Sequence, residues 1–302
     1  MNTPPHTARA HWATLGANLL FGINFSVVKF ISPQLIAPFA LNLVRVLVTA
    51  SLFWLLLRWQ PVKPGIRRSD LPRFIICALT GVTFNQLLFI KGLTLTTPIH
   101  AALLMLATPV FIQLLAWVVG QEVLRWLRLV GLALAIGGAA WLVLTRENSV
   151  VASNMLLGDI LVLVNAISYS FYFILVKPLM QRYSPLHIIR WLFTFGAFFM
   201  LPLCWNDFST TNWAVFTLPH WLSLAFVVLG ATFFAYLFTI YGLQHLSATA
   251  TGAYIYLQPL FSAVVATVFL GEEPAVYKLG AAVLIFTGVY LINRRQVQKN
   301  PS

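Results

Sequence analysis

Long apolar runs, separated by short polar segments, are the main pattern along this chain. Charged residues are absent from residues 10–28, 74–90, 92–121, 129–145, 160–176, 191–206 and 208–271. A helix that crosses a membrane needs roughly 20 mostly apolar residues, so the last of these runs is long enough for two. The runs do not alternate with a period of two, which favours membrane helices over a transmembrane β-barrel.

The polar segments and most of the prolines divide these runs into ten predicted membrane-spanning helices. We expect them at residues 10–31, 36–57, 71–91, 97–119, 126–145, 157–177, 185–204, 219–241, 248–270 and 275–293. The prolines expected between helices are Pro33, Pro61, Pro64, Pro98, Pro178, Pro185, Pro219 and Pro274. Pro109 and Pro259 instead fall inside the fourth and ninth helices, where a missing backbone hydrogen bond predicts a bend.

The chain also contains an internal repeat with a shift of 150 residues. Residues 92–142 align without a gap on residues 242–292, with identical residues at 92/242, 93/243, 109/259, 111/261, 116/266, 118/268, 122/272, 129/279, 134/284 and 138/288. The repeat predicts two units, residues 10–145 and 157–293, with short tails at 1–9 and 294–302. Five helices per unit is an odd number, so the second unit starts on the opposite side of the membrane. The expected fold is therefore an all-α integral membrane protein of two inverted five-helix repeats.

Composition and charge agree with a membrane location. Hydrophobic residues make up 60% of the chain and charged residues 9%, whereas soluble domains carry about 25% charged residues. The net charge of +12 could suggest nucleic-acid binding, but the basic residues are divided among short loops, so we expect no nucleic-acid partner. Lys and Arg gather in the loops that lie on the same side as both predicted termini, which predicts cytoplasmic termini.

Several motifs resemble a known family. Residues 20–29 read LFGINFSVVK, residues 270–274 read LGEEP, and residues 279–288 read LGAAVLIFTG. These resemble the opening and closing motifs of EamA-type domains in the drug/metabolite transporter superfamily. The first repeat departs from the pattern at Gln121-Glu122-Val123-Leu124, which lacks the proline. The resemblance implies a ten-helix inner-membrane carrier. Many members export amino acids or other small metabolites, and others move nucleotide sugars or triose phosphates.

Ionisable residues inside a membrane are costly to bury, so each is a candidate functional residue. Arg45 lies about eight residues into the second predicted helix, and Arg190 is its expected counterpart in the seventh. A guanidinium presents a planar fork of donors that suits a carboxylate or a phosphate. The structural alternatives are pairing with helix carbonyls or extension of the side chain toward the lipid headgroups.

Polar and aromatic residues predict a cavity. In the sixth helix Asn165, Tyr169 and Tyr172 share one face. The other candidate lining residues are Asn18, Asn24, Asn85, Gln86, Tyr236, Tyr254 and Gln258. Together they could line a central cavity for a small amphipathic solute. The alternative is that they only make hydrogen bonds between helices.

The charged residues near the helix ends give three further expectations. Lys29 and Lys177 end the first and sixth helices, where they are expected to complement the helix dipole and extend to the headgroups. Asp159 lies near the start of the sixth helix and His100 near the outer end of the fourth, so we expect no carboxylate within a span. This pattern predicts no carboxylate-based proton coupling at mid-membrane. It also argues against a site for polyvalent cationic drugs.

Glycines on the fifth and tenth helices predict close packing, either between the halves or between two subunits of a homodimer. They are Gly131, Gly137, Gly138, Gly280 and Gly288.

The function predicted from these patterns is secondary transport. The six histidines are scattered without ligand spacing, which argues against a membrane enzyme, a metal site or a cofactor. No filter motif supports a channel, which is the alternative from a different class. We expect a carrier that moves a small metabolite across the bacterial inner membrane by alternating access. The first expectation is export of neutral or aromatic amino acids, and the alternatives are phosphorylated or drug-like solutes. The expected partners are this small-molecule substrate and the lipid bilayer.

Overall fold

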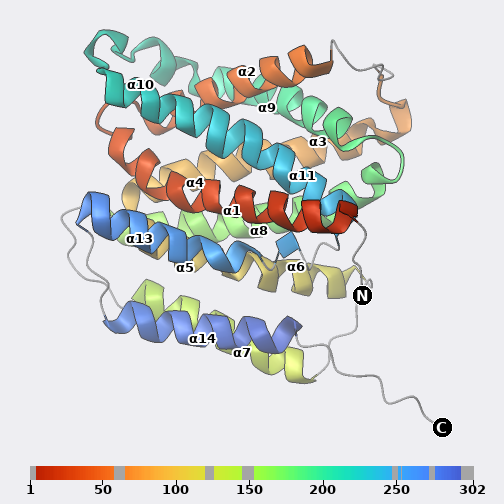
Figure 1. Cartoon of the computed structure of the whole chain (residues 1–302), viewed down its shortest axis with the longest axis vertical. Coiled ribbons are helices and arrows are strands. Elements are labelled where there is room, and N and C mark those ends of the chain that lie inside the picture. Colours follow the sequence, from red (N-terminus) through yellow and green to blue (C-terminus); the bar gives the residue numbers. More distant parts are fainter. Residues whose placement is uncertain are drawn as a thin grey trace.

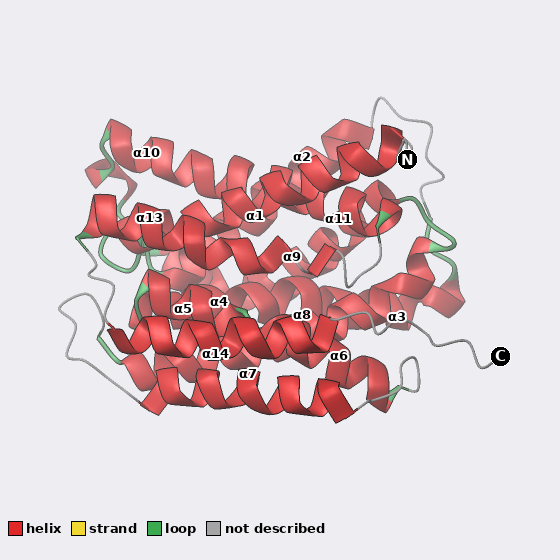
Figure 2. Ribbon diagram, turned by 60° about the horizontal axis from the view of Figure 1, so that its bottom comes forward, coloured by secondary structure: helices red, strands yellow, loops and turns green. Residues whose placement is uncertain are grey.

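The computed structural model describes residues 5–57, 65–119, 126–144, 153–246, 251–252, 254–271 and 276–293. Every regular element in these ranges is helical (Figure 2). Seven helices are long and apolar enough to cross a membrane, and three shorter apolar helices cover Leu129–Gly138, Tyr254–Leu270 and Leu279–Gly288. The expected all-α membrane fold with ten spans in two repeats is confirmed.

The first repeat contains five spans. They are α1 (Pro5–Ile31), α2 (Pro38–Leu57), a third span of η1 (Arg68–Asp70), α3 (Leu71–Ala78), η2 (Leu79–Thr83) and α4 (Phe84–Leu95), a fourth of α5 (Pro98–Met105) and α6 (Ala107–Val118), and α7 (Trp126–Leu144).

The second repeat follows the same plan. Its spans are α8 (Met155–Met180), α9 (Pro185–Ser209), an eighth span of α10 (Leu218–Ala225), η4 (Phe226–Phe234) and α11 (Ala235–His245), a ninth of η5 (Tyr254–Leu257) and α13 (Gln258–Leu270), and α14 (Val276–Asn293). The 3-10 turn η3 (Trp213–Val215) precedes α10.

One proline lies within a helix where the sequence predicted an end, and a second lies inside a helix that extends further than predicted. Helix α8 continues through Pro178 to Met180, and α9 continues through Pro202 to Ser209. A proline removes a single backbone N–H. In α8 this loss falls in the last turn, where the lost bond matters least.

The repeats interlock by exchanging partners (Figure 1). Helix α1 packs on α11 and α13 of the second repeat, while α8 packs on α4 and α6 of the first. The second spans, α2 and α9, pack on each other. The fifth spans, α7 and α14, also form a pair, which lies along one edge of the bundle in Figure 1. This exchange is what two repeats related by a two-fold axis produce.

Helix α7 contacts α14 through two of the five glycines that the sequence singled out, whereas Gly137 faces open space. A Cβ on Gly138 would lie 2.7 Å from Ile285, and one on Gly280 would lie 2.8 Å from Trp141. The close packing expected for these helices therefore occurs within one chain. The homodimer stays a prediction.

Each repeat contains a π-helical segment in its third span. The 150-residue shift of the repeat places residues 79–83 of η2 on residues 229–233 of η4. A π-helix is rare and often lies at a functional site, because it reorients side chains and leaves backbone carbonyls free for other partners. Its presence at equivalent positions marks these two spans for closer inspection.

The fourth and ninth spans are interrupted just before the prolines that align between repeats. Helix α5 ends at Met105, and Pro109 lies in the first turn of α6. The 3-10 turn η5 ends at Leu257, and Pro259 lies in the first turn of α13. In both spans the helix is interrupted before the proline. The proline then lies in the first turn of the next helix, where its missing N–H would have had no helical partner.

The backbones of α4 and α8 approach closely at two glycines. A Cβ added to Gly158 would lie 2.8 Å from the Gly92 carbonyl oxygen and 2.8 Å from the Thr96 nitrogen. Both neighbours are backbone atoms, so they cannot move aside as a flexible side chain could. Only glycine fits at this position.

We expect Gly158→Ala to lower stability by about 1–3 kcal/mol through overpacking. The matched control is Gly137→Ala on α7, where an added Cβ would meet nothing within 4 Å. The control should be neutral or stabilising by up to about 1 kcal/mol. Thermal unfolding of the purified variants in detergent measures both effects. Equal midpoints for the two variants would show that the α4–α8 approach is not tight.

Candidate functional site

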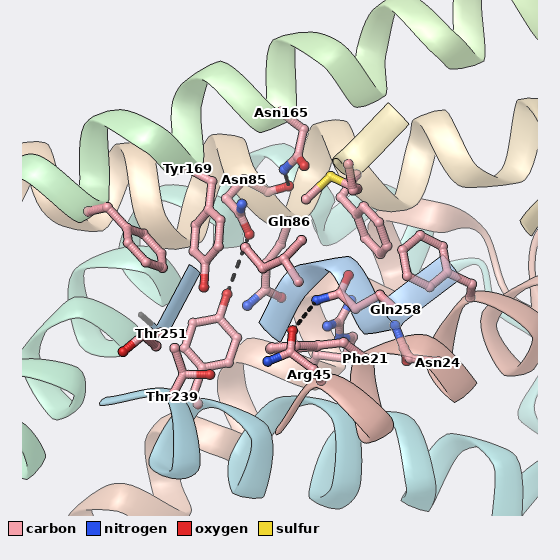
Figure 3. A pocket seen from close by; sticks show the side chains of 17 residues that line it. Phe21, Asn24, Arg45, Asn85, Gln86, Asn165, Tyr169, Thr239, Thr251 and Gln258 are labelled. Atoms are coloured by element: carbon pink, nitrogen blue, oxygen red, sulfur yellow. Dashed lines mark hydrogen bonds between the residues drawn. The ribbon is translucent and has the colours of Figure 1, made fainter. Parts of the chain in front are cut away.

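A cavity lies in the middle of the bundle, between the two repeats (Figure 3). It holds about 730 Å³ of space, including the part open to the outside. The lining residues come from both repeats and are Asn18, Phe21, Asn24, Phe25, Arg45, Asn85, Gln86, Phe89, Met105, Asn165, Tyr169, Phe173, Tyr236, Thr239, Thr251, Ile255 and Gln258.

Arg45 contributes the cavity's charge. It is 3% exposed, and its Nε donates to the Thr232 hydroxyl oxygen at 2.9 Å. That hydroxyl in turn donates to the Val227 carbonyl at 2.7 Å, five residues earlier in the π-helical η4. The π-helix thus positions the threonine that orients the guanidinium.

The protein satisfies only part of the hydrogen-bonding capacity of the Arg45 guanidinium. Its Nη1 is buried and has no hydrogen-bond partner among the described residues. The lining residues include no Asp or Glu. A buried cation without a counter-charge is costly unless a ligand supplies an anion. The electrostatics of the cavity therefore favour an anionic group beside Arg45.

Two amides join the repeats beside Arg45. Gln258 Nε2 donates to Asn18 Oδ1 at 2.7 Å, and Asn18 Nδ2 donates to the Thr14 carbonyl at 2.8 Å. Figure 3 shows Gln258 next to the Arg45 side chain. The bond connects α1 of the first repeat to the start of α13 of the second. It therefore fixes the first span against the ninth across the repeat boundary.

The opposite wall uses a second polar set. Asn165 Nδ2 donates to the Asn85 carbonyl at 2.5 Å. The Tyr236 hydroxyl donates to the Gly81 carbonyl at 3.3 Å and lies 3.4 Å from Asn85 Oδ1. Gly81 belongs to the π-helical η2, so each π-segment supplies an acceptor to a cavity residue or to its partner.

Aromatic rings form the apolar part of the lining. Phe25 and Phe89 meet edge to face with centroids 5.2 Å apart, and Tyr169 meets Phe173 in the same way at 4.8 Å. Such edge-to-face pairs are a favoured geometry. The cavity thus offers one charged group, several amides and an aromatic wall for an apolar side chain.

The structure brings together most of the residues that the sequence singled out. Arg45, Asn18, Asn24, Asn85, Gln86, Tyr169, Tyr236 and Gln258 all line the cavity.

Three other candidates lie elsewhere. Arg190 lies over the Trp54 ring at 4.4 Å, with its Nη2 3.0 Å from His187 Nδ1. Tyr172 packs against Gly81, and the Tyr254 hydroxyl lies 2.7 Å from His11 Nδ1.

Asn165, which helical periodicity placed on the same face as Tyr169, also lines the cavity. Other lining residues were not named as site candidates. Nothing in the sequence singled out Thr239 and Thr251, because the hydroxyl of a helical threonine commonly donates to a backbone carbonyl of its own helix. Thr239 does so by donating to the Ala235 carbonyl at 2.8 Å.

Comparison with known proteins identifies relatives of this chain. Residues 8–144 and 156–294 each match the EamA-like transporter family. An uncharacterized transporter of Archaeoglobus fulgidus is 26% identical over 93% of this chain and 96% of its own length. A probable terminal-alkyne amino-acid exporter of Streptantibioticus cattleyicolor is 32% identical over 76% and 77% of the two chains. A solved crystal structure at 18% identity shares the fold, with a TM-score of 0.69 over 95% of this chain and 98% of that one.

We expect the Asn18–Gln258 bond to contribute coupling between the repeats. A double-mutant cycle with Asn18→Ala and Gln258→Ala should give an interaction energy of about 0.5–1.5 kcal/mol in thermal stability. Asn18→Ala combined with Asn165→Ala is the control pair, because the two lie on different walls and should be additive. Additive effects in the first pair as well would mean that the bond does not form.

Proposed function

The chain belongs to the EamA-like transporter family and is a membrane transporter, and we propose that it exports neutral or aromatic amino acids by alternating access. The observation that carries this proposal is Arg45, a buried guanidinium with an unpartnered Nη1 in a cavity whose lining contains no acidic residue. A carboxylate accepts two parallel hydrogen bonds from a guanidinium. The α-carboxylate of an amino acid would supply the missing anion.

The rest of the cavity suits the remainder of an amino acid. An α-ammonium group needs acceptors, and Asn24 Oδ1 is buried without a hydrogen-bond partner among the described residues. The aromatic wall that includes Phe89 and Tyr169 would receive an apolar side chain. Rings also attract an ammonium group through their negative faces. A zwitterion therefore matches the cavity better than a purely apolar solute does.

Phosphorylated solutes fit this cavity less well. A phosphate ester carries up to two negative charges, which favours several converging cations. Arg45 is the lining residue with a permanent charge, whereas Arg190 lies over Trp54 and Lys29 donates to backbone carbonyls at 2.8 Å. Cationic drug-like solutes would want a buried acid, and the lining contains none.

The relatives add support for the substrate class. One relative is named as a probable terminal-alkyne amino-acid exporter. A terminal alkyne is a small apolar group, which the aromatic wall of this cavity could also accept. Export rather than import rests on that name, and the position of the site between the repeats agrees with an alternating-access carrier.

For the motion itself, we propose the breaks near Pro109 and Pro259 as bending points. Both spans are interrupted at equivalent places, and Gln258 of the cavity directly precedes one of these prolines. A break that already lacks helical hydrogen bonds needs little additional energy to change its angle. This arrangement would connect solute binding at Gln258 to helix bending.

We propose a bacterial inner-membrane location with both termini in the cytoplasm, on the basis of the Lys and Arg bias. Fusions of a fluorescent protein to residue 302 should fluoresce, and alkaline phosphatase at the same position should be inactive. Alkaline phosphatase inserted after Thr211, in the segment that joins α9 and α10, should be active. The reverse pattern would invert the topology.

We expect labelled amino acids to show saturable counterflow into proteoliposomes that contain the purified protein. Arg45→Ala should weaken the apparent affinity about ten- to one-hundred-fold, because a hydrogen bond to a charged group is worth about 1.5–3 kcal/mol. Arg45→Lys keeps the charge but loses the planar fork, so it should recover only part of the affinity.

The matched control is Arg190→Ala, because Arg190 is equally buried at 3% exposure but lies outside the cavity. All variants should be compared as monodisperse, folded protein. Counterflow unaffected by Arg45→Ala would leave a carrier whose carboxylate site is elsewhere. The absence of counterflow for every amino acid would contradict the proposed substrate class.

A further inference from the structure

A second buried polar cluster lies at the end of the bundle where α1 reaches Lys29. His100 and Asp159 are both 0% exposed, and His100 Nδ1 lies 2.8 Å from Asp159 Oδ1. The Thr96 hydroxyl donates to the same carboxylate oxygen at 2.8 Å. None of these residues lines the central cavity. We call His100, Asp159, Thr96 and Lys29 the end cluster.

Lys29 completes the end cluster, and its placement corrects the sequence expectation. It is 6% exposed rather than extended to the headgroups, and its Nζ donates to the carbonyls of Thr94 and Thr96 at 2.8 Å each. A third carbonyl, of Leu93, lies at 3.4 Å. These carbonyls close the C-terminal end of α4, so Lys29 complements the dipole of another helix.

Two polar atoms of the pair remain unused. Asp159 Oδ2 and His100 Nε2 are buried and have no hydrogen-bond partner among the described residues. An ionised carboxylate can take up a proton on an oxygen that no donor engages, here Oδ2, and the hydrogen-bonded imidazole of His100 then stays neutral. The pair therefore has vacant capacity for a proton at atoms that no other described group hydrogen-bonds.

The end cluster lies where four spans close the bundle. Asp159 lies in the second turn of α8, so a buried carboxylate does lie within a span, contrary to the sequence expectation. Thr96 follows α4, His100 is in α5, and Lys29 is in α1. The backbone also crosses this seam, since the Asn154 N–H donates to the Leu95 carbonyl at 3.2 Å. Two cavity residues, Phe25 and Met105, lie on α1 and α5 about one turn from this cluster. Opening the cavity at this end would separate these groups.

We propose that the His100–Asp159 pair is a proton-binding site whose protonation weakens the closure of the bundle at the Lys29 end. With Lys29 charged, Asp159 ionised and His100 neutral, the end cluster has no net charge. One added proton leaves a net positive charge in a closed, buried site, which is unfavourable. In the open state water solvates that charge, so the proton binds the open state more tightly and shifts the population toward it.

The other ionisable groups on the packed elements do not replace this pair. Helix α13, which packs on α5, carries no charged residue. Helix α4 contributes the half-buried Lys91. Helix α10, which packs on α1, brings His220 to the same end, with its ring 5.6 Å from that of Phe30, but its Nδ1 accepts from the Thr217 N–H at 3.1 Å. The other histidine and charged residues of α1 and α8 lie at the opposite end of the bundle and are His6, Arg9, His11 and Lys177, and α7 carries Arg128 in its first turn at that end.

The proposal is tested on the full-length protein in lipid nanodiscs without any solute. Infrared difference spectra between about pH 8 and about pH 5 should show the C=O stretch of a protonated carboxyl that Asp159→Asn removes. The chain has only seven Asp and Glu residues, so one band can be assigned. Asp70→Asn is the control, since Asp70 is a buried carboxylate at the opposite end that Arg182 Nη1 binds at 2.9 Å.

Opening is measured by hydroxyl-radical oxidation of native methionines. Met155, one turn before Asp159, should be oxidised several-fold faster at the lower pH, relative to Met200, which is 0% exposed in α9. Asp159→Asn should abolish the pH dependence, and Asp70→Asn should keep it. If Asp159→Asn does not fold, His100→Gln serves instead, because glutamine keeps a hydrogen bond to Asp159 but removes the imidazole that shares the proton with the carboxylate.

A wild-type protein without a pH-dependent change at Met155 would overturn the proposal, as would the same change in Asp159→Asn. A carboxyl band that survives Asp159→Asn would also overturn it. Because no solute is present, these results do not depend on whether amino acids are transported. If amino-acid counterflow failed while the pH response at Met155 persisted, the proposed substrate would be contradicted and the proton-binding site would stand.

Discussion

A guanidinium in the interior of a helical bundle needs acceptors or an anion, because its hydration is lost and lipid offers no replacement. In this protein Arg45 obtains one acceptor, the Thr232 hydroxyl at 2.9 Å, and keeps Nη1 unused. The π-helix around Thr232 places that hydroxyl, and the amides of Asn18 and Gln258 lie on the adjacent wall. The central cavity is thus arranged around a charge that the protein itself only partly satisfies.

Much of the architecture could be predicted from the sequence, because a membrane imposes a simple length rule. Apolar runs of sufficient length located all ten spans, and the identities between repeats indicated two related halves. The details that could not be predicted depend on contacts between helices. The sequence does not reveal π-segments such as η2, because they insert one residue without a composition signal. Pro178 looked like an end but lies in the last turn of α8, where one missing bond is tolerated.

The sequence identified which residues line the candidate site more reliably than it identified where their side chains point. Arg45 and Arg190 occupy similar places along their helices, yet only Arg45 lines the cavity, since α9 turns Arg190 toward Trp54. Tyr169 and Tyr172 are less than a turn apart, and a small rotation of α8 decides which one faces the cavity. Lys29 is a clearer failure, because its partners lie 65 and 67 residues away at the end of α4. Periodicity along one helix carries no information about such partners.

The approach of Gly92 and Gly158 has a mechanical consequence. Side chains that interdigitate can exchange rotamers while two helices slide, but two backbones in direct contact have no such freedom. A Cβ at Gly158 would already lie 2.8 Å from the backbone at the end of α4, so a shift along the helix axis would bring the side chain of the next residue into that space. Rotation about the contact keeps the same atoms together. The crossing of α4 and α8 therefore acts as a pivot, which restricts the relative motion of the two repeats at this point to tilting.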